Sequence, residues 1–143
     1  MVFRAQLLQK SSGEPTAAEQ TALQIGPHEP IVRKRRLLTT LSRPFVLEDA
    51  SLAAGRLPGL QIETVGDWCL TAVAQQHGVH VAHGCEEVRV EEAAPEIAAL
   101  LSVVPGTTLV RLDRVMLSTG GVPLEWRSAA CHLLDEYYHA EVS

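Results

Sequence analysis

The sequence predicts an α+β fold, in which helices pack on a mostly antiparallel β-sheet. Apolar and polar residues alternate with the period of a strand in many segments of the chain. Two pairs of such segments are joined by short turn sequences, which is typical of β-hairpins and therefore of antiparallel pairing. Segments with helix start and stop signals lie between the strands. Together these observations favour helices packed against a sheet that is built from local hairpins.

The N-terminal segments predict a strand, a turn and a helix. Residues 4–8 alternate as a short strand, and residues 11–14 are typical of a turn. Thr16 is a favourable N-cap residue, and Glu19 follows three positions later, as in a capping box. A Gly-Pro pair at residues 26–27 ends the helix that begins there.

The next segment predicts a hairpin that carries charged residues inside its apolar pattern. Residues 31–38 and 45–51 alternate as strands around a turn at residues 39–44. Because side chains alternate between the two faces of a strand, Arg36 shares a face with apolar neighbours, and Glu48 lies on the returning strand. An unpaired buried charge is too unfavourable to keep. These charges therefore either neutralise each other or bind a polar ligand.

The middle of the chain predicts a second helix and two short strands. A loop rich in glycine and proline leads to a helix at about residues 67–76, capped by Asp67 and ended by Gly78. Residues 79–81 and 87–91 then alternate as strands.

The C-terminal part predicts a third helix and a second hairpin. Residues 94–102 form the helix, with Pro95 in its first turn. Residues 107–117 and 122–131 flank a Ser-Thr-Gly-Gly turn, which is a clear hairpin signal. On the first of these strands Arg114 shares a face with apolar side chains, so a second arginine lies within an apolar pattern.

Length and composition indicate one globular domain over residues 1–143. A hydrophobic content of 46% with 20% charged residues is enough to bury a core. No apolar run approaches the roughly 18 residues that a membrane helix needs, so no membrane partner is expected. Cys69, Cys85 and Cys131 form no CxxC pair, which favours reduced thiols and a cytoplasmic protein.

The charge distribution argues against DNA binding by this chain itself. The net charge is −5, and the densest basic cluster occupies residues 33–36. On a strand these side chains divide between two faces, so they make no broad basic surface.

Motifs for metal, cofactor or nucleophile chemistry are weak. His80 and His83 lie three residues apart in an extended segment, on opposite faces, so they do not make a paired ligand set with Cys85 and Glu86. The sequence contains neither a GxSxG elbow nor a phosphate-binding GxxxxGK[ST] loop. We therefore expect no metal, no cofactor and no catalytic residue.

An ordered set of short segments resembles one known family. The segments are AAEQTALQIGPHEPI at residues 17–31, RL at 36–37, RPFVLE at 43–48, LPGL at 57–60, HGV at 77–79, EIAALL at 96–101, PGT at 105–107, LDR at 112–114 and GVPLE at 121–125. In this order they resemble the UTRA effector-sensing domain, the C-terminal half of transcription regulators of the GntR superfamily, HutC subfamily. The resemblance covers nearly the whole chain from about Gln6.

The resemblance implies a chorismate-lyase-like fold that encloses one small-molecule site. It also implies a homodimer that transmits ligand occupancy to a winged-helix DNA-binding domain, which would precede Met1. DNA would then be contacted only through that domain. The chain would be either a fragment of such a regulator or a free-standing sensor.

The resemblance also implies site residues. Arg36, Glu48 and Glu125 stand where members that sense sugar phosphates place ligand-contacting residues. Several polar groups of those members are replaced here, by Leu38, Trp68 and Cys131, while Tyr137 lies nearby in a differently spaced tail. One arginine suits a carboxylate better than a phosphate dianion, and the replacements make the cavity more apolar. The predicted ligand is a small carboxylate with an apolar body, bound by these residues: Arg36, Glu48, Trp68, Glu125 and Tyr137.

Two other functions remain open at this point. An arginine and two carboxylates in an apolar pocket are compatible with a lyase-like enzyme, because the namesake of the fold cleaves an enol-pyruvyl compound. A fold alone does not carry function, however. The third possibility is a dimerisation module without a ligand, which the charges among apolar strand positions disfavour.

Overall fold

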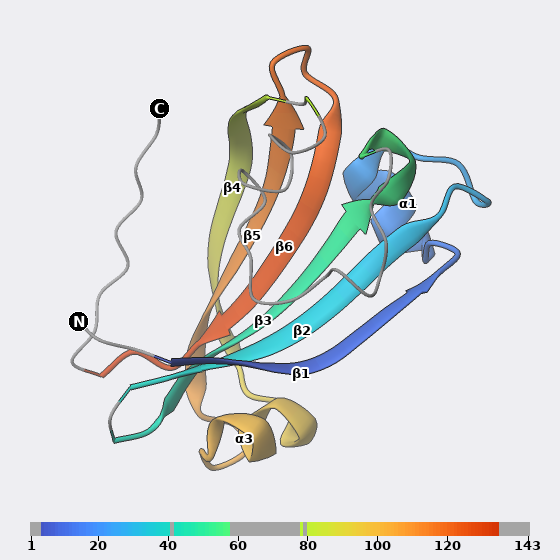
Figure 1. Ribbon diagram of the computed structural model, residues 1–143. Helices are drawn as coiled ribbons and strands as arrows, with labels where there is room; N and C mark the ends of the chain where they lie inside the picture. The colour runs from blue at the N-terminus through green and yellow to red at the C-terminus, as the bar shows by residue number, and fades with distance from the viewer. Residues whose placement is uncertain (1–3, 41, 58–77, 79, 135–143) are drawn as a thin grey trace.

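The computed structural model describes residues 4–40, 42–57, 78 and 80–134. Within these ranges the chain forms one six-stranded sheet, two α-helices and a short 3₁₀ helix (Figure 1). The elements in chain order are β1 (Arg4–Gly13), α1 (Ala17–Leu23), β2 (Ile31–Thr39), β3 (Pro44–Ala53), η1 (Ala54–Arg56), β4 (Val81–Glu92), α3 (Pro95–Leu101), β5 (Thr108–Ser118) and β6 (Pro123–Cys131). The predicted α+β class is confirmed.

The strand order is β1-β2-β3-β6-β5-β4, and every neighbouring pair is antiparallel. β2 and β3 form the predicted N-terminal hairpin, and β5 and β6 form the predicted C-terminal hairpin. The central pairing of β3 with β6 joins the two hairpins, while β1 and β4 are the edges of the sheet.

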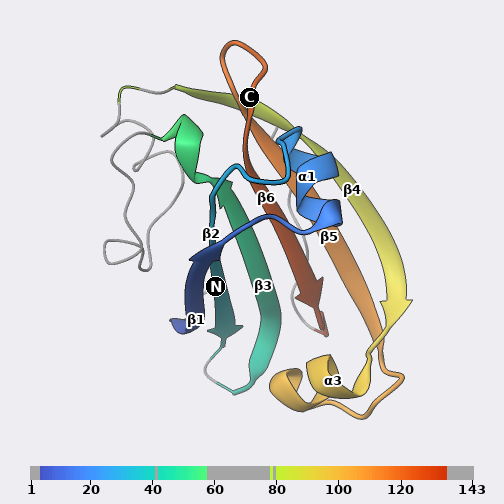
Figure 2. The same cartoon turned by 90° about the vertical axis from the view of Figure 1, so that its right-hand side faces the viewer.

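Strand alternation gives this sheet two distinct faces. One face, which we call the helix face, carries Arg33, Arg35, Leu47 and Trp126, and both described α-helices pack on it (Figure 2). We call the other face the Arg36 face. It carries these residues of β2, β3, β6, β5 and β4: Lys34, Arg36, Leu38, Val46, Glu48, Glu125, Arg127, Ala129, Cys131, Leu112, Arg114 and Glu86.

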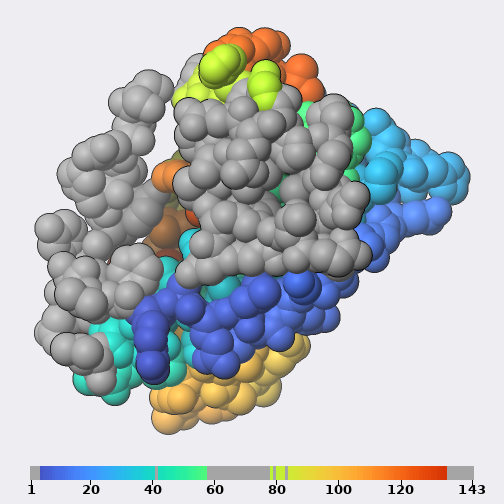
Figure 3. Space-filling model, in the orientation of Figure 1, coloured from blue at the N-terminus to red at the C-terminus, as the bar shows by residue number. Residues whose placement is uncertain are grey.

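The helix face buries the apolar sides of α1 and α3. Ala98 and Leu101 of α3 pack on Leu47, Leu109 and Ala130 of the sheet. Leu8 of β1 also packs against this cluster, and the space-filling view shows β1 in blue beside α3 in gold (Figure 3).

α1 covers the other end of the same face. Leu23, at the end of α1, packs with Ile31, Ala53 and Trp126. Buried aliphatic side chains of this size each contribute about 1.5–3 kcal/mol through the hydrophobic effect.

The Arg36 face has its own apolar clusters at both ends. One contains Leu38, Val46, Ala129 and Cys131. The other contains Leu52, Leu57 and Leu124. The charged residues of this face therefore lie between two apolar regions.

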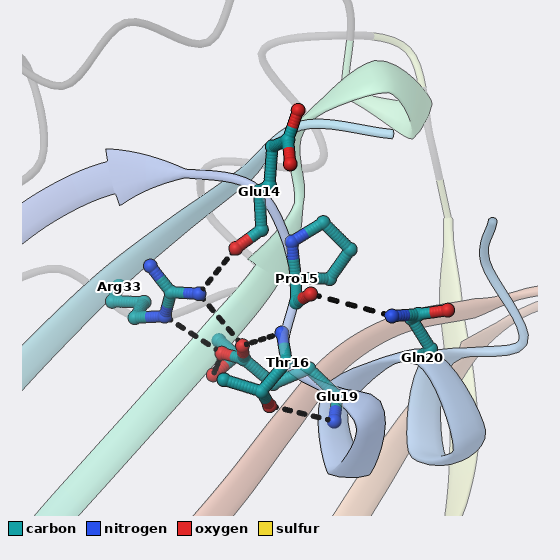
Figure 4. Close-up of polar contacts among 7 residues, drawn as sticks. Glu14, Pro15, Thr16, Glu19, Gln20 and Arg33 are labelled. Atoms are coloured by element: carbon teal, nitrogen blue, oxygen red, sulfur yellow. Dashed lines mark hydrogen bonds and ion pairs between the residues drawn. The ribbon is translucent and has the colours of Figure 1, made fainter. Parts of the chain in front are cut away.

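The start of α1 is tied to β2 and β3 by a buried carboxylate. Thr16 and Glu19 form the predicted capping box, with Thr16 N donating to Glu19 Oε1 at 2.8 Å and Glu19 N donating to Thr16 Oγ1 at 3.2 Å (Figure 4). Arg33 also donates to both Glu19 oxygens, at 2.7 and 2.9 Å, and Ser51 Oγ donates to Oε2 at 2.6 Å. Burial by itself would raise the pKa of Glu19, but these hydrogen bonds outweigh it and hold the pKa at about 2.

Two strands differ from the prediction. β1 continues to Gly13, through the segment that we expected to be a turn, because a register shift between Leu7 and Gln9 lets the polar residues beyond it keep pairing with β2. The turn composition of this segment is tolerated because β1 is an edge strand.

β4 is one continuous strand rather than two short ones. Its pairing with β5 extends through Gly84, where an added Cβ would lie 2.0 Å from the carbonyl oxygen of Val115. Gly84 therefore allows the backbones of β4 and β5 to approach closely, and it does not interrupt the strand.

The remaining elements agree with the predictions or fall outside the described ranges. α3 begins with Pro95 in its first turn, as expected. The helix predicted at residues 67–76 lies outside the described residues. Neither described α-helix is long and apolar enough to cross a membrane.

The Glu19 network predicts a pH-dependent contribution to stability. A carboxyl with a lowered pKa stabilises the native state fully above its ordinary value of 4.5, and that contribution is lost as the pH falls toward about 2. Glu19→Gln should therefore lower the free energy of unfolding at pH 7 by ~3 kcal/mol. The difference from wild type should shrink below pH 4.5. Urea unfolding at several pH values measures it. Glu14→Gln, at an exposed side chain, is the control and should leave the curve almost unchanged. A pH-independent difference for Glu19→Gln would contradict the prediction.

Candidate functional site

A row of charged side chains crosses the middle of the Arg36 face. Strand register places Arg36 opposite Glu48, Arg127 opposite Arg114, and Arg114 opposite Glu86. β2, β3, β6, β5 and β4 thus each contribute a charged group to one surface. The alternation of each strand and the antiparallel register bring these groups together.

Arg36 and Glu48 form a partly buried ion pair. Arg36 Nε donates to Glu48 Oε1 at 2.6 Å, and the two side chains are 17% and 8% exposed. The other oxygen of Glu48 lies 3.7 Å from Arg127 Nη1. The two predicted residues therefore neutralise each other, and a ligand that binds Arg36 must share or replace the carboxylate of Glu48.

Glu125 is the most deeply buried charged residue in the described part of the chain, with no exposed surface. Arg127 Nη2 lies 3.0 Å from Glu125 Oε1 in an ion pair. Among the described residues, however, no aligned hydrogen bond reaches either oxygen of Glu125. Burial raises the pKa of Glu125, and the nearby Arg127 and Lys34 only partly offset this effect.

Lys34 is a further positively charged residue of the Arg36 face. It lies on β2 two residues before Arg36 and is 2% exposed. Burial lowers its pKa, as does the neighbouring charge of Arg36, while Glu125 acts in the opposite direction. The ammonium group of Lys34 is therefore shielded from solvent and interacts with the charges of Arg36 and Glu125.

A cavity of about 140 Å³ opens on this row. It is lined by Glu48, Glu86, Leu112, Arg114, Arg127 and Ala129. Arg114 donates to Glu86 Oε2 from Nε at 3.1 Å and from Nη2 at 2.8 Å. The cavity is smaller than the roughly 300 Å³ at which pockets for drug-sized ligands begin, so it suits a small group.

Two larger cavities, of about 510 and 710 Å³, lie on the helix face. Their arginines are engaged in ion pairs, including Arg35 with Asp49 at 2.7 Å and Arg111 with Glu91 at 2.6 Å. Four buried side-chain atoms lack a hydrogen-bond partner within the described ranges, and all four belong to residues of the Arg36 face: Glu86, Glu125 and Arg127. The unmet hydrogen-bonding capacity therefore lies on the face opposite the α-helices.

The structure describes three of the five predicted site residues. Arg36, Glu48 and Glu125 lie on one face of the sheet, and Arg127 contacts both carboxylates. Trp68 and Tyr137 lie outside the described residues. Whether any of the five binds a ligand stays a prediction.

Lys34, Arg127 and Glu86 were not among the site residues predicted from the sequence. The first two follow the same alternation as the predicted residues, because Lys34 precedes Arg36 by two positions and Arg127 follows Glu125 by two. Glu86 gave no such signal, since it fell in a segment that was not expected to be a strand.

The described part of the chain holds no cluster of three or more side chains suited to a metal ion. Cys131, the last residue of β6, is 3% exposed, and burial raises the pKa of its thiol to about 11. A thiol with this pKa is almost fully protonated at neutral pH and is a poor nucleophile.

A family model for the UTRA domain matches residues 1–137. Among solved structures, the chain is 30% identical to the ligand-binding domain of a GntR-family transcriptional regulator from Bordetella bronchiseptica. That alignment has a TM-score of 0.82 and covers 99% of this chain and 88% of the other.

Structures of PhnF from Mycobacterium smegmatis match with the same fold. Its effector domain is 23% identical, with a TM-score of 0.80, over 92% of this chain and 81% of that chain. A longer PhnF structure is 22% identical, with a TM-score of 0.81, over 97% of this chain and 64% of that one.

The burial of Glu125 predicts a second pH effect, opposite in sign to that of Glu19. A carboxyl with a raised pKa binds its proton more tightly in the native state, so the native state loses stability as the pH rises above the ordinary value of 4.5. Glu125→Gln removes this ionisation. The variant should therefore become more stable relative to wild type as the pH rises from 4.5 to 8, as measured by chemical unfolding. Glu87→Gln, at an exposed position on β4, should run parallel to wild type. Parallel curves for Glu125→Gln would show that Glu125 is ionised in the folded protein at no cost.

Proposed function

Because the chain belongs to the UTRA domain family and is a regulatory effector-binding domain, we propose that its effector binds to the charged row of the Arg36 face. The observation that carries this proposal is the set of buried atoms of Glu86, Glu125 and Arg127 that have no hydrogen-bond partner among the described residues. Unsatisfied buried polar atoms are costly, at about 1–3 kcal/mol each. A polar ligand that supplies the missing partners offsets this cost and gains affinity from it.

The proposed effector is a small carboxylate with an apolar body. Arg36 binds its acidic group by replacing or sharing the Glu48 carboxylate, which lies 2.6 Å away. The apolar cluster that includes Leu38 and Cys131 lies next to the charged row and supports the apolar body of the ligand. Glu125 contributes from β6, and Trp68 and Tyr137 are further proposed contacts.

The proposed mechanism is a population shift between two arrangements of a homodimer. An effector that binds one arrangement more tightly moves the equilibrium toward it by the difference in binding free energy. In a regulator of the HutC type, this shift would change the spacing of two winged-helix domains that precede Met1. DNA would be bound by those domains, in the cytoplasm.

The enzyme alternative has less support. The Cys131 thiol is protonated at neutral pH, and Arg36 and Glu48 are paired with each other. The neighbouring structure from Bordetella bronchiseptica is the ligand-binding domain of a GntR-family transcriptional regulator. We therefore propose that the domain is not catalytic. A dimerisation module without a ligand would not need buried polar atoms on the Arg36 face that lack hydrogen bonds within the described ranges.

A thermal-shift screen tests the effector class. Small carboxylates with an apolar or ring body should raise the melting temperature, because a ligand that binds only the native state stabilises it by about 2.7 kcal/mol at a hundredfold excess over its Kd. Arg36→Ala should abolish the shift, since loss of a buried charge contact costs about 2–5 kcal/mol. Arg89→Ala, on the helix face, is the control and should keep the shift. Hits limited to sugar phosphates would reverse the ligand class, and a full response in Arg36→Ala would remove Arg36 from the site.

The assembly prediction is that this chain alone forms a two-fold dimer and binds no DNA. Its net charge of −5 works against the attraction to phosphates that supplies most non-specific DNA affinity. Among the described strands β1 and β4 lie at the two edges of the sheet, and we propose that a second copy covers one of these edges. Light scattering at micromolar concentration measures the mass, and a gel-shift titration measures DNA binding. A strictly monomeric mass would contradict the predicted dimer. Micromolar DNA affinity at physiological salt would contradict the prediction that this chain alone binds no DNA.

A further inference from the structure

Arg114 and Arg127 are direct cross-strand partners, although they carry the same charge. Like charges directly opposite each other destabilise a sheet unless other groups compensate them. Compensation comes from three carboxylates. Glu86 binds Arg114 from β4, and Glu125 and Glu48 lie 3.0 and 3.7 Å from Arg127. The two guanidinium groups are therefore paired with protein carboxylates, one of which, Glu48, is shared with Arg36.

The cavity between these pairs still contains unused hydrogen-bonding capacity of both kinds. Arg127 directs its two terminal nitrogens to Glu48 and Glu125, while its buried Nε has no partner among the described residues. Glu86 uses Oε2 for Arg114, and its buried Oε1 likewise has none there. One donor and one acceptor thus remain on two residues that line the same cavity of about 140 Å³.

We propose that this cavity is a second polar subsite, which binds a neutral group of the effector that both accepts and donates a hydrogen bond. Arg127 Nε donates to the oxygen of this group, and Glu86 Oε1 accepts from its N–H or O–H. A primary carboxamide or a hydroxyl has this combination. A second carboxylate does not, because at neutral pH it lacks a donor and would face the carboxylates of Glu86 and Glu48.

The subsite is continuous with the proposed anchor for the acidic group. Glu48 binds Arg36 through Oε1, and it also lines the cavity with Arg127. The effector class that follows is a small monocarboxylate with a carboxamide or hydroxyl at its other end. Leu112 and Ala129 provide the apolar wall between the polar groups. This inference rests on the proposed effector site and narrows its ligand.

Three matched probes test the subsite by calorimetry and thermal shift on the wild-type chain: benzoate, 3-carbamoylbenzoate and isophthalate. They share a ring and a carboxylate, and they differ only in a hydrogen, a carboxamide or a second carboxylate. We expect 3-carbamoylbenzoate to bind at least tenfold more tightly than benzoate, and isophthalate to bind no better than benzoate. The wild-type series needs no variant, so it does not depend on the folding of a mutant.

Arg127→Lys then tests the donor. Lysine keeps the positive charge beside Glu48 and Glu125 but removes Nε. In this variant 3-carbamoylbenzoate should bind no more tightly than benzoate, so the tenfold preference of the wild-type chain should be lost. Arg89→Lys, which retains a positive charge beside Asp113 on the helix face, is the matched control and should keep the tenfold preference.

The outcomes separate the subsite from the proposed function. Equal binding of benzoate and 3-carbamoylbenzoate, a preference for isophthalate, or an unchanged preference in Arg127→Lys would overturn the subsite while leaving the effector site standing. If neither these probes nor any carboxylate in the broader screen binds, both the carboxylate effector and the subsite are wrong.

Discussion

β3 and β6 pair across the centre of the sheet, and this pairing joins two hairpins that lie far apart in the sequence. Its register sets Glu48 opposite Ala129 and Ala50 opposite Arg127. A slip of one residue would move every β6 side chain to the other face, because the side-chain period of a strand is two. Arg127 would leave its carboxylates, and Ala130 would leave the core beneath α3. The core and the charged row therefore depend on the same register.

The charged row shows how a small domain retains ionisable groups in its interior. Removing one partner of a buried ion pair costs about 3–5 kcal/mol, because the remaining charge is left uncompensated. Here the charges compensate one another as a network in which Glu48 contacts Arg36 and Arg127, and Arg127 also contacts Glu125. A ligand that binds in this network replaces one ion-pair partner of a side chain with another. It does not have to neutralise an unpaired charge. This makes binding sensitive to the shape and polarity of the ligand.

The two faces of the sheet divide structural and binding roles. On the helix face, Glu19 has hydrogen bonds from Arg33, Ser51 and Thr16, so its polar groups are used to fix α1 on the sheet. On the Arg36 face, Glu125 is fully buried and lacks aligned donors in the described ranges. The larger cavities lie on the helix face, so hydrogen-bond satisfaction and not cavity size favours the Arg36 face as the binding surface. The opposite pKa directions of Glu19 and Glu125 reflect the same contrast.

The sequence by itself determined the fold class, the α1 capping box, both hairpins and the shared face of Arg36 and Glu48, because these follow from local periodicity and turn chemistry. It did not predict the full lengths of β1 and β4, since residues 11–14 have the composition of a turn and the segment between residues 81 and 87 was not expected to be a strand. Only the tertiary structure placed Glu86 beside Arg114 and Arg127 beside Glu48. Those contacts depend on the register between strands that are distant in the chain, and no local pattern encodes that register.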